Sequence, residues 1–354
     1  SLVNMKKYYT RACNFFYGST SNELLKRRLS LPLCGDKSIS FNQIEIFTRN
    51  KKKVNSKIID IQNINKLPKL IKKKVNQDIK KIIKKREFLK GKNHLIMGVL
   101  NMTPDSFSDG GKFNSKVKGT KQALKMFKSG ANIIDIGGES TKPGSKGINA
   151  KIEWNRINKI LKSISKKIPI SLDTRKSEIM QKGIKLGVKI INDVSGLNYD
   201  PKTLNILNKY KIPFVLQHSQ GTPENMQNKP YYKNELLEIY DFFEEKIKFL
   251  KSIGIRHNNI IIDPGIGFGK NLKHNMNLIS NISIFHSLGL PILVGNSRKR
   301  FIKEISGKND TKNRIGGTVA SSIYLMMQGV QILRVHDVNE LLQGVKVFNR
   351  LINQ

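Results

Sequence analysis

Short apolar runs alternate with longer amphipathic segments along most of the chain. Eight runs of strand length lie beyond residue 93, at 94–100, 132–136, 168–172, 188–191, 213–216, 259–262, 291–294 and 330–333. Stretches with helical periodicity follow them, for example 117–128, 151–165, 177–186 and 236–253. Alternating strands and helices predict a parallel sheet. Eight repeats in 262 residues match a (β/α)8 TIM barrel of α/β class, typically about 250 residues long, with a doubly wound open sheet as the alternative.

The first 92 residues follow another pattern. Residues 31–46 predict a small β-rich piece with a Gly-Asp turn, and six later apolar residues recur at helical spacing among lysines. Those six are Leu70, Ile71, Val75, Ile79, Ile82 and Ile83. We interpret them as a basic amphipathic helix that packs on its own domain, with contact to RNA or lipid as the alternative. The predicted division is an N-terminal extension at 1–92 and a barrel at 93–354.

Polar or glycine-rich residues follow every predicted strand. They are Asn101, the GGEST run at 137–141, Asp173, Thr174, Asn192, Asp193, His218, Asp263, the NSRK run at 296–299, Arg334 and His336. The loops after barrel strands share the C-terminal face, where TIM-barrel sites lie. The longest polar stretch, LNMTPDSFSDGG at 100–111, reads either as a surface turn or as a functional loop. Because polar residues follow all eight predicted strands, we favour one functional site on one face of the barrel.

The charge of the chain is extreme, with 64 Lys and Arg against 26 Asp and Glu and a net charge of +38. The first 92 residues hold 24 of the basic and 6 of the acidic residues. Lys, Asn and Ile are all abundant and all have AT-rich codons, so codon bias explains the surplus without a polyanionic partner. We therefore do not expect nucleic acid as a partner, although the surplus would attract a polyanionic small substrate.

The two cysteines, Cys13 and Cys34, form no CxxC pattern and predict neither a disulfide framework nor a zinc site. We therefore expect the protein to be in a reducing compartment, the cytoplasm. No run approaches the roughly 18 apolar residues of a membrane helix, so no membrane association is expected. The basic, acid-poor segment 6–28 leaves an organellar presequence as a second interpretation.

Several strand-end residues suit a flat, charged ligand. Asp173 and Asp263 could serve as bases, metal ligands or partners for N–H groups, or could merely cap helices. Asn192 can both donate and accept hydrogen bonds. Arg334 and His336 share one face of an extended stretch near the region where this fold commonly binds phosphate. The DPGIGFGK run at 263–270 is not a P-loop, because a P-loop needs GxxxxGK followed by Ser or Thr.

Eight segments together resemble the dihydropteroate synthase family of folate biosynthesis. They are NMTPDSFSDGG (101–111), DIGGESTKPGS (135–145), SLDT (171–174), INDVSG (191–196), DPGIGFGK (263–270), NSRKRF (296–301), RIGGTVA (314–320) and ILRVHDV (332–338). The resemblance covers about residues 93–349, in order. A weaker likeness at 31–49 is to an extension that some bacterial members carry.

The resemblance implies a transferase that joins 6-hydroxymethyl-7,8-dihydropterin pyrophosphate to p-aminobenzoate and releases pyrophosphate. Asp173, Asn192, Asp263 and Lys299 would hold the pterin at the barrel floor. Asn101 would help to ligate Mg²⁺ on the diphosphate, which Arg334 and His336 would grip. The loops at 103–113 and 140–147 would close over the site and build the aminobenzoate slot with Thr141, Pro143, Phe107 and Phe268. The resemblance further implies a sulfonamide target, and we expect a homodimer.

The chain departs from the family pattern at four positions. Lys142 stands where Arg is usual, which forfeits bidentate geometry. Gln217 and Ser219 replace the methionines of a Met-His-Met run and make the pterin-flanking wall more polar. Arg300 stands where some members have Ser. A pterin-binding methyltransferase barrel is the alternative function, and a nucleic-acid-binding protein on a decayed barrel is the third hypothesis.

Overall fold

A computed structural model describes residues 6–86, 88, 92, 94–107, 115–307 and 310–354. Eight of its strands form one parallel sheet in the order β10-β9-β8-β7-β6-β5-β12-β11. These strands are β5 (Leu95–Asn101), β6 (Ile133–Gly137), β7 (Ile170–Asp173), β8 (Ile190–Asp193), β9 (Phe214–Gln217), β10 (Ile260–Asp263), β11 (Leu293–Val294) and β12 (Ile332–Val335). A bridge between Ile262 and Ile292 joins the two ends of the sheet. The sheet is therefore a closed barrel.

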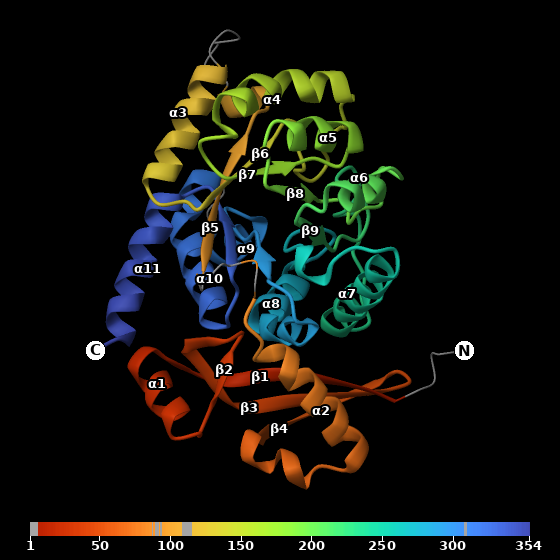
Figure 1. Cartoon of the computed structure of the whole chain (residues 1–354), viewed down its shortest axis with the longest axis vertical. Helices are drawn as coiled ribbons and strands as arrows, with labels where there is room; N and C mark the ends of the chain where they lie inside the picture. Colours follow the sequence, from red (N-terminus) through yellow and green to blue (C-terminus); the bar gives the residue numbers. More distant parts are fainter. Residues whose placement is uncertain (1–5, 87, 89–91, 93, 108–114, 308–309) are drawn as a thin grey trace.

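Helices surround the barrel, as Figure 1 shows. They are α3 (Ser115–Lys128), α4 (Ala150–Ile164), α5 (Ser177–Lys185), α6 (Thr203–Tyr210), α7 (Glu235–Ser252), α8 (Leu272–Ser280), α9 (Arg300–Ser306), α10 (Ile315–Met327) and α11 (Val338–Ile352). The outward-facing strand residues and the helices share the large apolar core, while a second core of interior strand residues fills the barrel. Phe88, from the segment before β5, packs against that interior core.

The N-terminal extension forms an antiparallel sheet of its own. Its strands are β1 (Lys7–Tyr17), β2 (Leu31–Leu33), β3 (Asp36–Asn50) and β4 (Lys53–Asp60), and β3 pairs with each of the other three. Two helices accompany them, α1 (Gly18–Lys26) and α2 (Lys69–Ile82). The apolar residues of α2 and this sheet form a separate small core. Helix α2 therefore packs on the sheet of the extension.

The extension lies against the end of the barrel at which the strands begin (Figure 1). Lys7, Tyr9 and Arg49 all contact Asp241 on α7, at 2.7, 2.8 and 2.6 Å. On the other side, Arg86 donates to the carbonyl oxygen of His286 at 2.9 Å. In TIM barrels this end serves stability, so the extension leaves the opposite, functional face uncovered.

The predicted barrel is confirmed, with strand boundaries shifted by at most two residues. The predicted helix at 70–83 is present as α2, but Leu70 is 70% exposed and does not belong to the buried stripe. The sequence pattern missed β1, α1 and β4. Most of β4 is exposed, so its residues carry no alternation of apolar and polar side chains. Residue 93, where the predicted division falls, lies outside the described residues, and that division stays a prediction.

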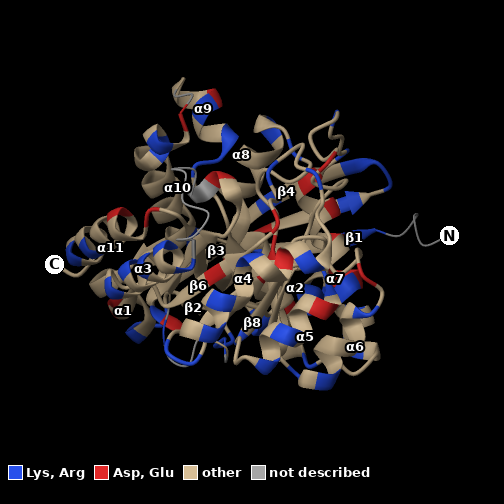
Figure 2. Ribbon diagram, turned by 90° about the horizontal axis from the view of Figure 1, so that it is seen from above, with Lys and Arg blue, Asp and Glu red and all other residues tan. Residues whose placement is uncertain are grey.

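Among the described helices, none is long and apolar enough to cross a membrane. Both cysteines are buried and free. Seen from above, Lys and Arg lie on the outer helices as well as on the extension (Figure 2).

Candidate functional site

Strand alternation directs one set of polar side chains into the barrel mouth. The interior core takes one apolar residue from each of β6, β8, β9, β10 and β12, and a polar residue follows two positions later. These pairs are Ile133 and Asp135, Ile190 and Asn192, Val215 and Gln217, Ile261 and Asp263, and Ile332 and Arg334. Because side chains two residues apart point to the same face of a strand, these polar groups converge above the apolar interior.

Asp135 is the centre of a buried hydrogen-bonded cluster. Its Oδ2 accepts from Arg334 Nε at 2.7 Å and from Asn192 Nδ2 at 3.1 Å. Arg334 also reaches Asp173, with Nη2 3.5 Å from Oδ2. Gly137 faces Asp173 so closely that a Cβ there would lie 3.1 Å from the carboxylate oxygen. The cluster thus joins β6, β7, β8 and β12 in one acid, amide and guanidinium group.

Electrostatics in this cluster favour the protonated form of one carboxyl group. Burial raises the pKa of Asp173 well above its usual value, and the neighbouring Asp135 adds to this while Arg334 opposes it. Among the described residues, Asn192 Oδ1, Asp135 Oδ1 and Gln217 Nε2 are buried and have no hydrogen-bond partner. Buried polar atoms are rarely left unpaired, so these atoms indicate where a polar ligand binds.

A second group of charges lies around Asp263. Burial raises the pKa of Asp263, whereas Lys299 opposes this shift. Burial lowers the pKa of Lys299 to about 7, with Asp263 opposing. Lys299 donates to the carbonyl oxygen of Ile266, and its Nζ lies 4.6 Å from the centre of the Phe268 ring. Lys299 and Phe268 are therefore neighbours beside Asp263.

The glycine-rich run after β10 folds into a tight turn that holds these groups. Asp263 Oδ1 accepts from the backbone N–H of Gly265 at 2.8 Å. Gly265 has a φ of +73°, and a Cβ there would collide with the carbonyl oxygen of His218. Buried Lys270 donates to the carbonyl oxygen of Phe268 at 2.8 Å, and its Nζ lies 3.0 Å from His218 Nδ1. The glycine at 265 thus permits close approach between the turn after β10 and the backbone that follows β9.

The residues after β11 and β12 divide between the site and the surface. Ser297 Oγ lies 2.9 Å from His336 Nδ1, and burial next to Arg334 lowers the pKa of His336 to about 3. The low pKa favours the neutral form of His336 in the free protein. Arg298 pairs with Asp337 at 2.6 Å. The Arg300 side chain is 76% exposed and pairs with Glu304 at 2.7 Å.

The predicted site residues on the loops, and at the end of β5, are less buried than those of the barrel floor. Asn101 ends β5 opposite Gly137 and is half-buried. Thr141 is half-buried and Pro143 exposed on the loop after β6, and neither forms a hydrogen bond or ion pair with a floor residue in the part of the chain that the structure describes. The side chain of Phe107 lies outside the part of the chain that the structure describes, as do residues 108–114 of the same loop.

Metal-binding capacity is limited in the described ranges. They contain no group of three or more His, Cys, Asp or Glu side chains that could hold a metal ion. Asn101 offers one amide oxygen, and oxygen is the ligand type that Mg²⁺ prefers. Because protein-bound Mg²⁺ commonly takes only one or two protein ligands and completes its shell with phosphate and water, this donor fits a metal shared with a diphosphate.

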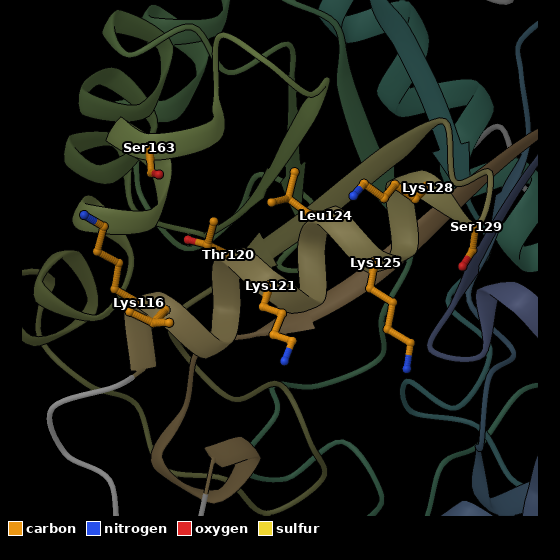
Figure 3. Close-up of a pocket in the computed structure, with 9 residues that line it drawn as sticks. Lys116, Thr120, Lys121, Leu124, Lys125, Lys128, Ser129 and Ser163 are labelled. Carbon is orange, nitrogen blue, oxygen red and sulfur yellow. The ribbon is translucent and has the colours of Figure 1, made fainter.

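A separate groove of about 690 Å³ lies on the outer surface of α3, away from the strand ends (Figure 3). It is lined by Lys116, Val117, Thr120, Lys121, Leu124, Lys125, Lys128, Ser129 and Ser163. All but Ser163 come from α3 and the residue after it. None of the predicted site residues belongs to this groove.

Sequence reasoning missed two central side chains. Asp135 is a buried acid within the apolar strand IIDIG, and its position two residues after the interior Ile133 was the available signal. Lys270 is the second missed side chain. It ends the DPGIGFGK motif and is buried. Burial lowers its pKa to about 7.

Residues 97–336 match the model of the pterin-binding enzyme family. The chain is 40% identical over 263 residues to a dihydropteroate synthase of Synechocystis, covering 74% of this chain and 91% of the relative. It is likewise 40% identical over 254 residues to that of Escherichia coli, covering 71% of this chain and 89% of the relative.

The chain belongs to the dihydropteroate synthase family. Its fold agrees, because a Yersinia pestis dihydropteroate synthase in a sulfonamide drug complex superposes with a TM-score of 0.70 at 37% identity, over 74% of this chain and 95% of that one. A Xanthomonas albilineans dihydropteroate synthase in complex with 7,8-dihydropteroate gives a TM-score of 0.66 at 32% identity, covering 73% and 93%. The expected family, the barrel and the transferase class are confirmed.

Proposed function

We propose that the chain joins 6-hydroxymethyl-7,8-dihydropterin pyrophosphate to p-aminobenzoate, giving 7,8-dihydropteroate and pyrophosphate. The amine nitrogen of p-aminobenzoate attacks the methylene carbon, the bond from that carbon to the diphosphate oxygen breaks, and the amine loses a proton. Family membership supports the reaction. The observation that carries it for this chain is the convergence of unpartnered amide and carboxylate atoms with a guanidinium group at one barrel mouth.

The pterin ring would lie on the floor formed by Asp173, Asn192 and Asp263. Its amino and ring N–H groups are donors that two carboxyl groups can accept, and the free Asn192 Oδ1 can accept a third. Lys299 would donate to the carbonyl oxygen or a ring nitrogen. These contacts would replace the hydrogen bonds to water that the polar groups lose on burial.

The diphosphate would lie against Arg334 and His336. Arg334 presents a guanidinium group, which suits phosphate oxygens, and it is already held in place by Asp135. His336 would contribute an N–H donor rather than a charge, because its pKa is about 3 in the free protein. Electron-rich dihydropterin can carry the positive charge that develops on its methylene carbon as the diphosphate leaves, so stabilising the leaving diphosphate would supply most of the rate enhancement.

Mg²⁺ would be held by Asn101 together with the diphosphate. When bound, the ion would neutralise charge on the leaving group. Replacing Asn101 with Ala should raise the Mg²⁺ concentration needed for half-maximal activity while leaving pterin binding without the diphosphate unchanged. An unaltered Mg²⁺ requirement would contradict this assignment.

The aminobenzoate slot would be formed by Thr141, Pro143, Phe107 and Phe268. Phe268 is supported by its place beside Lys299. Thr141 and Pro143 lie on a loop whose backbone also contacts the loop after β9, since Gly144 N–H donates to the Pro223 carbonyl oxygen at 2.7 Å. Two neighbouring loops thus border the barrel mouth from the side where an acceptor amine would enter.

The direct test is an assay of pyrophosphate release with both substrates and Mg²⁺. Release should require p-aminobenzoate. A pterin-binding methyltransferase would bind the pterin but release no pyrophosphate, so the absence of release under these conditions would reject the proposed reaction.

We also infer that two copies of the chain associate through α10 and α11. Helix α10 contains no charged residue in a chain with 64 Lys and Arg, and it packs along α11. Exposed apolar side chains lie on both helices, namely Tyr324, Val347 and Leu351. Sedimentation should give twice the chain mass for the native protein and the single mass for Tyr324→Lys. A native monomer would refute the dimer.

A further inference from the structure

Beside the proposed aminobenzoate slot lies a buried network of charges. No hydrogen bond or ion pair joins it to the floor residues in the described part of the chain, although the Glu153 carboxylate contributes to the raised pKa of Asp173. The network comprises Glu139, Glu153, Arg175 and Lys176, all at most 9% exposed. Arg175 Nε donates to Glu139 Oε1 at 2.9 Å, and Lys176 Nζ donates to Glu139 Oε2 at 2.9 Å. Lys176 also lies 3.5 Å from Glu153 Oε2. Two acids and two bases thus neutralise one another within the protein.

Glu139 closes the base of the loop after β6, here called the β6 loop (residues 138–149). It stands near the start of the loop, and its Oε2 accepts from the backbone N–H of Ile148 near the end, at 3.0 Å. Within the loop, Ser145 Oγ donates to the Ser140 carbonyl oxygen at 2.8 Å. A single carboxylate therefore fixes both ends of the segment that carries Thr141 and Pro143.

Arg175 connects this loop to three others. Its own loop follows β7, and its guanidinium lies 4.1 Å from the centre of the Tyr199 ring, in the loop after β8. Its Nη2 lies 3.5 Å from Glu224, in the loop after β9. The β6 loop passes directly over it, because a Cβ at Gly147 would lie 3.0 Å from Nη2. The loops after four successive strands thus meet at one side chain.

The charge state of the network suits a fixed support. Burial alone would raise the pKa of Glu139, but hydrogen bonds from Ile148, Lys176 and Arg175 outweigh it and lower the pKa. Burial raises the pKa of Glu153 to about 7, although Lys176 opposes this shift. Glu139 is therefore the anion that holds both cations at neutral pH, and Glu153 is the weaker partner.

We propose that Arg175 and Glu139 are positioning residues for p-aminobenzoate, which fix the β6 loop over the barrel mouth without touching either substrate. The floor residues Asp173 and Asn192 stand on strands held by the barrel sheet, so we expect pterin binding to depend on this network much less than p-aminobenzoate binding does. Thr141 and Pro143 stand on a loop whose place depends on the network. The inference rests on the proposed placement of p-aminobenzoate against this loop.

The test compares Arg175→Met and Glu139→Gln with the native enzyme. We measure KM for p-aminobenzoate, kcat, and the Kd of pterin pyrophosphate in the absence of p-aminobenzoate. A charge-assisted hydrogen bond within a buried site is strong enough to shift binding by about tenfold or more. Arg175→Met should therefore raise KM for p-aminobenzoate by at least about tenfold and leave the Kd of pterin pyrophosphate within about twofold. Arg175→Lys should restore part of the loss.

Lys182→Met is the matched control, because Lys182 forms an exposed ion pair with Glu178 on the helix that follows Arg175. It should change neither constant. If Arg175→Met does not fold, Glu139→Gln answers the question, since its amide oxygen can still accept from Ile148. An unchanged KM for p-aminobenzoate in the folded variants, or an equal loss of pterin binding, would overturn the inference.

The variant Thr141→Ala distinguishes a failure of this inference from a failure of the proposed function on which it rests. If Thr141→Ala raises KM for p-aminobenzoate and Arg175→Met does not, only the positioning role is wrong. If Thr141→Ala leaves that KM unchanged, the proposed placement of p-aminobenzoate is wrong, and the positioning role falls with it.

Discussion

Replacing Arg334 with Met tests the energetics of the buried cluster. In the native protein its guanidinium contacts Asp135 at 2.7 Å and Asp173 at 3.5 Å, and both carboxyl groups are buried. Removing one partner of a buried ion pair typically costs 3–5 kcal/mol, because the remaining charge is left without compensation. Asn192 still donates to Asp135 in the variant, so we expect the lower end, about 3 kcal/mol.

The loss should depend on pH. Burial already raises the pKa of Asp173 in the native fold, and removing the opposing Arg334 raises it further. A carboxyl group with a raised pKa in the folded state binds its proton more tightly there than in the unfolded chain. Its contribution to stability is present at low pH and disappears as the pH rises through the folded-state pKa. Arg334→Met should therefore lose more stability at pH 8 than at pH 5.

Urea unfolding followed by circular dichroism at both pH values measures this loss. Arg334→Met combined with Asp135→Asn removes one of the two uncompensated acids and should recover a substantial part of it. Arg300→Met is the control, since its exposed pair with Glu304 should contribute about 0.5 kcal/mol or less. Native-like stability of Arg334→Met at pH 8, or a double variant weaker than the single one, would refute the reasoning.

Three further results are expected. Asp263→Asn keeps the shape of the floor but loses a carboxylate, so the Kd for the pterin should rise by about 30-fold or more in calorimetry; an unchanged Kd would mean that the floor is assigned wrongly. The pKa of Lys299 is about 7, so binding of pterin pyrophosphate should weaken as the pH rises from 6 to 9, by at most about tenfold per unit. That slope should flatten in Lys299→Met, and a slope that persists there would point to another group. Gly265→Ala should destabilise the fold by several kcal/mol in urea unfolding, because its Cβ would meet the carbonyl oxygen of His218; near-native stability would show that the turn can move.

The barrel could be predicted because its strands are buried on both faces. Such strands appear as continuous apolar runs, and the polar residues that end them stand out against those runs. Asp173, Asn192 and Asp263 were found in this way. Strand β4 could not be found, because most of its side chains are exposed and its sequence KVNSKIID shows no clean alternation.

The contacts that the site residues make with one another could not be predicted from the sequence. Asp135 and Arg334 are 199 positions apart, and only the pairing of β12 with β5, the neighbour of β6, brings them together. The neutral state of His336 likewise follows from burial and from the nearby Arg334. The β6 loop showed polar residues but not the Arg175 contact that supports it, because that contact depends on four loops meeting in space.

The extension and the chemistry occupy opposite ends of the molecule. The extension, with the lysines of β4 and α2, is held against the barrel by the contacts at Asp241 and His286. These contacts lie on the side where the strands begin. An anion that collects on that surface would therefore lie far from Arg334, the residue proposed to bind the diphosphate. If the proposed site is right, the charge of the extension could change without altering the barrel mouth, because the two lie at opposite ends of the strands.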